Sequence, residues 1–255
     1  ALVILWQAYE QFTADSYLML CVPLAAPFLL QPILFPLPAE RNLPFYLRYS
    51  FKANLWLAIF SFIGSYWYTH YFYSVLSASY TFPAHRLNDV PIALYFAAHF
   101  YFVTYHTFSN MILRRIESRY LPGVGRTVFF WTAVIAFSYF TAFMETLTIS
   151  SFPYYSFKDR YMAYTLGSAF YGIYFIVSFP VFYRLDEKVG LIESTSALTT
   201  TGSSGTATVA TTTLSTITAP HTLFQTCADS LGTSMLVLLL LDFCRLFCGI
   251  ELNIG

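Results

Sequence analysis

The sequence of 255 residues carries few charges of either sign. Lys and Arg number 13, Asp and Glu number 13, and charged residues make up 10% of the chain, against about 25% in ordinary soluble domains. So few charges could not cover a water-exposed surface, which excludes a soluble globular enzyme. The chain also lacks the positive field of a nucleic-acid binder and the polar composition of a disordered protein. A membrane protein with several spans remains.

Cysteine and histidine are scarce too. The four cysteines include no C-x-x-C pair, so neither a disulfide framework nor a zinc site is predicted. Five scattered histidines do not supply the clusters that membrane di-iron oxygenases need. The chain has no G-x-G-x-x-G nucleotide motif and no G-x-S-x-G nucleophile motif. Acid–base chemistry on an apolar substrate, without a metal or redox cofactor, is the chemistry left open.

Apolar and aromatic residues are abundant instead. Hydrophobic residues make up 57% of the chain and aromatic residues 20%, more than interfacial belts of Trp and Tyr require. Most of this excess is attributed to packing, and the functional alternative is a pocket for a flat apolar ligand. A span needs about 20 apolar residues. Six stretches satisfy this and predict an all-α, polytopic transmembrane helical bundle: residues 16–38 (proline-rich and kinked), 55–73, 91–113, 127–149, 161–183 and 230–250.

The predicted organisation has three parts. Residues 1–193 form most of the bundle, and residues 1–9 are expected to be the end of an earlier, truncated span. Residues 194–220 contain 11 Thr, 5 Ser and no charge, which predicts a low-complexity insertion. A flexible cytosolic loop or an artefact of gene prediction is favoured over a glycosylated stalk. Residues 228–255 hold the last span and the C-terminus.

The basic residues predict the orientation. Nine of the 13 fall in residues 39–54, 114–126 and 184–229, and three fall in the loops of the other side. Because cytosolic loops are enriched in Lys and Arg, the first set of loops is expected to be cytosolic.

Ionisable side chains inside the spans are the candidates for chemistry, because such groups are costly in a membrane. They are His70, His99, His106, Glu145, Asp242 and Arg245. All except His106 are expected in the lumenal half of the bundle. Helical periodicity puts two polar stripes on otherwise apolar helices. The residues of these stripes are Tyr95, His99, His106 and Asn110 on one helix, and Ser138, Thr141, Glu145 and Thr148 on another.

Structural alternatives stay open for each candidate. The histidines could bond backbone carbonyls, and Asp242 could simply pair with Arg245 three residues later. The predicted catalytic residues are Glu145, His99, His70, His106 and Asp242. The predicted substrate-binding residues are Tyr95, Asn110, Trp67, Tyr139 and Thr141.

Several stretches resemble plant-type cycloeucalenol cycloisomerase, the cyclopropylsterol isomerase family. They are residues 52–56 (KANLW), 68–72 (YTHYF), 78–83 (ASYTFP), 105–110 (YHTFSN), 113–115 (LRR), 138–140 (SYF), 145–146 (ET), 149–150 (IS), 152–155 (FPYY), 159–160 (DR), 174–180 (YFIVSFP) and 186–188 (DEK). The resemblance runs from about residue 1 to 193 and resumes near 228 with Asp229, Asp242 and Arg245. The truncated first span and residues 194–220 depart from the family pattern.

The resemblance implies a multi-pass enzyme of the endoplasmic reticulum membrane that opens the 9β,19-cyclopropane ring of a cyclopropyl sterol. Its partners would be the sterol and membrane lipid, with no nucleic acid, and the redox-neutral reaction requires no cofactor. Beyond the resemblance, we infer from the residues themselves that Glu145 protonates C19 and that His99 or His70 serves as the base or as a proton relay. Aromatic faces stabilise the cation.

Two rival functions remain. One is a non-enzymatic sterol-binding or transport protein, and the other is a sterol Δ8–Δ7 isomerase of the emopamil-binding type. The stretches that carry the resemblance disfavour both.

Overall fold

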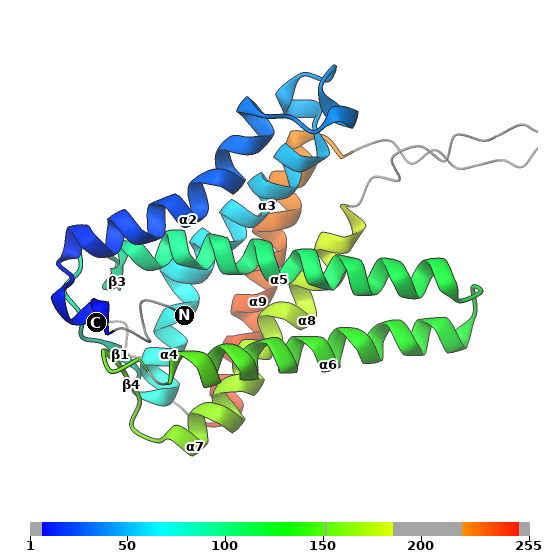
Figure 1. The fold of residues 1–255 in the computed structure, drawn as a ribbon. Coiled ribbons are helices and arrows are strands. Elements are labelled where there is room, and N and C mark those ends of the chain that lie inside the picture. The colour runs from blue at the N-terminus through cyan, green and yellow to red at the C-terminus, as the bar shows by residue number, and fades with distance from the viewer. Residues whose placement is uncertain (1–6, 151, 186–220, 250–255) are drawn as a thin grey trace, which may run out of the picture.

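The computed structural model describes residues 7–150, 152–185 and 221–249, and most of these are helical (Figure 1). The helices and helical turns are η1 (Ala8–Gln11), α2 (Ala14–Leu34), η2 (Pro38–Glu40), η3 (Phe45–Leu47), α3 (Tyr49–Ile63), η4 (Gly64–Tyr68), α4 (Thr69–Leu76), α5 (Ile92–Arg119), α6 (Val124–Ile149), α7 (Arg160–Met162), η5 (Ala163–Gly167), α8 (Ser168–Arg184) and α9 (Leu223–Phe247). The strands are β1 (Ser79–Tyr80), β2 (Arg86–Leu87), β3 (Val90–Pro91) and β4 (Tyr155–Ser156). The helical prediction is confirmed, and the strands form two short antiparallel pairs, β1–β4 and β2–β3, outside the helices.

Four of the described helices are long and apolar enough to cross a membrane. They are Ala14–Leu34, Val124–Ile149, Ala163–Arg184 and Leu223–Phe247. The stretches predicted at 55–73 and 91–113 are helical as well, but the first is interrupted by η4 and the second lies in the more polar α5. The count of six spans therefore stays a prediction. The partial span at 1–9 falls mostly outside the described residues, and the insertion at 194–220 falls outside them entirely.

Several helix ends differ from the predicted limits of the spans, and local sequence explains two of these differences. The first span was expected to reach residue 38, but α2 ends at Leu34. Proline disfavours helical backbone in the residue before it, and Pro36 follows directly after Phe35, the C-cap. The last span was expected to begin at 230, but α9 begins at 223. Thr222 and Gln225 form a capping box there, each side chain bonding the other residue's backbone N–H.

An arginine secures the turn between α2 and α3. The guanidinium of Arg48 donates to the carbonyl of Pro32 at 2.7 Å and to that of Ile33 at 3.1 Å. Helix C-termini leave such carbonyls without intrahelical partners. A side chain at the start of one helix thereby caps the end of the preceding one.

The core is aromatic and lies where α3, α5, α8 and α9 meet. Trp56, Phe60, Phe175 and Phe179 are all fully buried. Helix α3 packs on α9 and α5, and α8 packs on α6 and α9. Figure 1 shows α5 and α6 side by side as a long hairpin that crosses α3 and α9.

Two π-helical segments interrupt the bundle. They are η4 and η5, each of five residues. Helix α4, which follows η4, approaches η5 closely, since a Cβ on Gly167 would lie 2.8 Å from Leu76 Cδ1. Such π segments occur frequently at functional sites.

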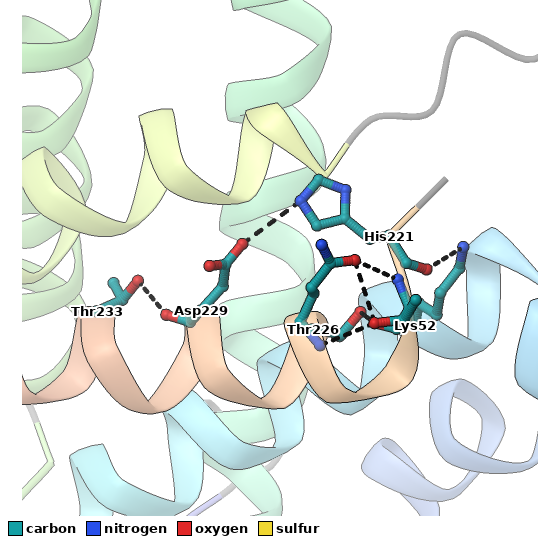
Figure 2. A network of polar contacts seen from close by, with 7 residues as sticks. Lys52, His221, Thr226, Asp229 and Thr233 are labelled. Atoms are coloured by element: carbon teal, nitrogen blue, oxygen red, sulfur yellow. Dashed lines mark hydrogen bonds and ion pairs between the residues drawn. The ribbon is translucent and has the colours of Figure 1, made fainter. Parts of the chain in front are cut away.

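A polar network fastens the start of α9 to α3 (Figure 2). The buried ammonium of Lys52 donates to the carbonyl of His221 at 3.1 Å. The ring Nε2 of His221 lies 3.5 Å from a carboxylate oxygen of Asp229, nearly two turns into α9. Deeper in the pair, Ser230 Oγ donates to the carbonyl of Trp56 at 2.7 Å. These contacts place α9 against α3 directly after the segment outside the described residues.

Replacing Lys52 by Met should lower the thermal unfolding midpoint in detergent. The change leaves the His221 carbonyl without this donor, which costs about 1–3 kcal/mol or about 2–12 °C in a protein of this size. The exposed Lys158 supplies the matched control, Lys158→Met. Equal midpoints for the two variants would show that the Lys52 contact does not hold α9 in place.

Candidate active site

A cavity of about 140 Å³ lies between α4, α5, α6 and α8, next to the β1–β4 pair. Aromatic residues are the largest group in its wall. The eight aromatic residues that line it are Phe72, Tyr80, Tyr101, Phe102, Tyr155, Phe157, Tyr171 and Tyr174. The π segment η4 contributes Gly64 and Ser65 to the same wall. Concave apolar sites with a few polar groups are the usual form of a small-molecule site.

Glu145 is the single acidic group on this wall. Among the described lining residues it is the only one with a carboxyl, imidazole, guanidinium or ammonium group. The hydroxyl of Tyr171 donates to Glu145 Oε2 at 2.7 Å, and Tyr105 of α5 also interacts with this carboxyl. The arrangement offers one transferable proton, held by phenols, in an otherwise apolar space.

Two tyrosines from separate loops stack on one side of the cavity. Tyr80 and Tyr155 are directly opposite each other in the β1–β4 pair. Their ring centroids lie 4.4 Å apart with an interplanar angle of 18°. Burial raises the pKa of both phenols, so both stay neutral at physiological pH. They present π faces whose quadrupole attracts positive charge.

The three predicted histidines are buried, but none is among the described residues that line the cavity. His106 Nδ1 donates to the carbonyl of Phe102 at 2.8 Å, which leaves Nε2 to accept from the Ser178 hydroxyl at 2.9 Å. His106 therefore bonds a backbone carbonyl, as its structural alternative expected. The ring of His70 packs edge-on against Tyr73 at 5.5 Å. The cavity does not bring His99 or His70 together with Glu145.

Asp242 also lies away from the cavity lining. Its Oδ1 is 2.7 Å from a guanidinium nitrogen of Arg245, on the same helix. The pairing alternative raised by the three-residue spacing is therefore confirmed.

The five predicted substrate-binding residues do not line the cavity either. The Tyr95 hydroxyl donates to the carbonyl of Leu87 at 2.9 Å. The amide of Asn110 donates to the Tyr49 hydroxyl at 3.5 Å. Three remain: Trp67 and Tyr139 are exposed on the bundle surface, and Thr141 is buried in it. Of the ten predicted site residues, Glu145 alone faces the cavity.

Sequence reasoning missed the tyrosines around Glu145. Tyr80, Tyr155 and Tyr105 lie in the stretches 78–83, 152–155 and 105–110, which carry the family resemblance. That overlap was a usable signal for them. Tyr171 had none, because its contact with Glu145 depends on how α8 packs against α6.

The sequence predicted neither a metal site nor a disulfide. Within the ranges that the structure describes, no three His, Cys, Asp or Glu side chains form a group that could hold a metal ion. All four cysteines are free thiols in those ranges.

The chain is similar to one characterised enzyme over nearly its whole length. It is 40% identical over 250 residues to cycloeucalenol cycloisomerase of Arabidopsis thaliana, which covers 97% of this chain and 79% of that protein. No family model and no solved structure matches the chain. Identity of this extent confirms the resemblance carried by the stretches quoted above. The chain belongs to the cycloeucalenol cycloisomerase family, a family of isomerases.

Proposed function

We propose that this protein is a membrane sterol isomerase that opens the 9β,19-cyclopropane ring of cyclopropyl sterols, as in the conversion of cycloeucalenol to obtusifoliol. One observation carries the proposal beyond family membership: the carboxyl of Glu145 faces a cavity walled by aromatic rings. Ring opening requires an acid and a surface that tolerates a carbocation, and this cavity offers both. The substrate is apolar, which suits a site among membrane-length helices.

The proposed reaction is an acid-catalysed isomerisation. Glu145 transfers its proton to C19, the C9–C19 bond breaks, and its electron pair forms the new C–H bond of the methyl group. Positive charge develops at C9. Loss of the proton at C8 then forms the Δ8 double bond, so the reaction is redox-neutral and requires no cofactor. The rings of Tyr80 and Tyr155 would face the developing charge.

The base of the second step was predicted to be His99 or His70. Neither lines the cavity, whereas the Glu145 carboxylate left by the first step does. In a 9β,19-cyclopropyl sterol, C19 and the 8β hydrogen lie on the same face of the ring system. We therefore propose that one carboxyl acts first as acid and then as base, which regenerates it for the next turnover.

The membrane arrangement is part of the proposal. We propose six whole spans in the endoplasmic reticulum membrane, with the α5–α6 turn in the cytosol and β4 in the lumen. The uneven distribution of basic residues supports this orientation. Ser118 and Ser156 are both exposed, and this arrangement would put them on opposite sides of the membrane. Single cysteines at these positions in sealed endoplasmic-reticulum microsomes should label from outside at 118 only, and labelling at 156 only would invert the topology.

Sterol profiles test the function against its rivals. Cells that lack this gene should accumulate cyclopropyl sterols, and the purified full-length protein in lipid should convert cycloeucalenol to obtusifoliol without added cofactor. Accumulation of Δ8 sterols would instead favour the Δ8–Δ7 isomerase. An unchanged profile, with sterol binding but no conversion, would favour a transport protein.

A further inference from the structure

Two phenols from different helices meet at the carboxyl of Glu145. Tyr171 comes from α8 and Tyr105 from α5, while Glu145 is on α6. Tyr171 is 9% exposed, and its ring packs edge-on against Tyr174 at 4.9 Å. Tyr105 packs edge-on against Phe175, with ring centroids 5.6 Å apart. Packing therefore fixes both donors before any substrate arrives.

We propose that Tyr171 and Tyr105 are positioning residues for ring opening. They hold the Glu145 carboxyl toward the cavity and stabilise the carboxylate that forms when its proton leaves. This role rests on the proposed function, because it requires Glu145 to be the proton donor. Neither phenol gives up its own proton, so the atom balance of the reaction is unchanged.

The direction of the effect follows from the charge on the acceptor. A phenol O–H bonds a neutral carboxylic acid weakly and a carboxylate about twice as strongly. The hydrogen bond from Tyr171 and the interaction with Tyr105 therefore strengthen as the proton moves to C19. Interactions that are stronger in the transition state than in the ground state raise kcat rather than tighten substrate binding.

The chain offers a matched control on the same helix. Tyr183 also donates its hydroxyl to a carboxylate, Glu117 Oε2 at 2.8 Å, but neither residue lines the cavity. Removing the Tyr183 hydroxyl therefore removes a phenol–carboxylate hydrogen bond outside the cavity.

The test compares Phe variants of the full-length protein in ring-opening assays. Tyr171→Phe and Tyr105→Phe should each lower kcat by about 10- to 100-fold, the effect of removing a hydrogen bond to a charged group. Their KM should stay within about threefold of the parent value, since the removed hydroxyl is not expected to contribute to binding of the ground-state substrate. Tyr183→Phe should keep a near-parental kcat.

A double-mutant cycle separates positioning from a general structural role. In a Glu145→Gln background, Tyr171→Phe should cause no further loss, because no carboxylate forms there. An equal further loss in that background would overturn the inference. The inference would also be overturned if Tyr171→Phe and Tyr105→Phe both kept a near-parental kcat while Glu145→Gln was inactive. That result would leave the proposed function intact. Absence of conversion by the parent would instead remove the proposed function itself. If Tyr171→Phe fails to insert, the same cycle is run with Tyr105→Phe.

Discussion

Glu145→Gln is expected to open the cyclopropane ring about 10²–10⁴-fold more slowly than the parent, which is the usual contribution of general acid catalysis. Gln keeps the shape of the side chain and can still accept from Tyr171, but it has no proton of comparable acidity to transfer. Sterol binding should persist, because the wall of the cavity is unchanged. The measurement is kcat on cycloeucalenol beside a sterol-binding assay on the same preparation.

Glu117→Gln is the matched control. Glu117 is exposed on α5, accepts from the Tyr183 hydroxyl at 2.8 Å and does not line the cavity. Its substitution should leave kcat near the parent value. A parental kcat for Glu145→Gln would show that the carboxyl of Glu145 has a structural role. The proton donor would then lie outside the described lining of the cavity.

Replacing Tyr80 or Tyr155 by Leu should also slow ring opening. A desolvated ring face stabilises a cation by about 1–2 kcal/mol, so each Leu variant should lose roughly 5- to 30-fold in kcat. The effects should not add, because the two rings stack on each other and support each other's position. Steady-state kinetics of the two single variants and the double variant measure this.

Phe variants at the same positions separate the ring from the hydroxyl. Tyr80→Phe and Tyr155→Phe keep a π face and should retain most of the activity that Leu removes. If Phe and Leu variants lose activity equally, the hydroxyl groups matter and cation stabilisation by the rings is not their role.

Much of the helical content could be predicted from the sequence, because runs of about 20 apolar residues leave few alternatives. The residues at which the helices begin and end were harder to predict. The T-x-x-Q capping box at Thr222 was readable in the sequence, but an apolar run alone placed the start of α9 too late. The segments η4 and η5 could not be predicted, since a π turn depends on the packing of its neighbours.

The site was partly predictable for a different reason. An intramembrane carboxyl is so costly that Glu145 was a candidate by chemistry alone. The same argument applied to the histidines, yet both ring nitrogens of His106 are already hydrogen-bonded, to Phe102 and to Ser178. Periodicity tells which face of a helix a residue occupies, but it does not tell what that face meets. His99 lies between the lining residues Ala98 and Tyr101 of α5, yet its own side chain is not part of the described lining.

The central claim is that ring opening takes place in the cavity lined by Glu145. A structure of the full-length Glu145→Gln variant with a bound cyclopropyl sterol tests it most directly, because slow turnover preserves the substrate. The account predicts the cyclopropane C19 within about 3–3.5 Å of the side chain at position 145, with the ring system against Tyr80 and Tyr155. A sterol bound beside His70 or His99, with its cyclopropane out of reach of position 145, would contradict it.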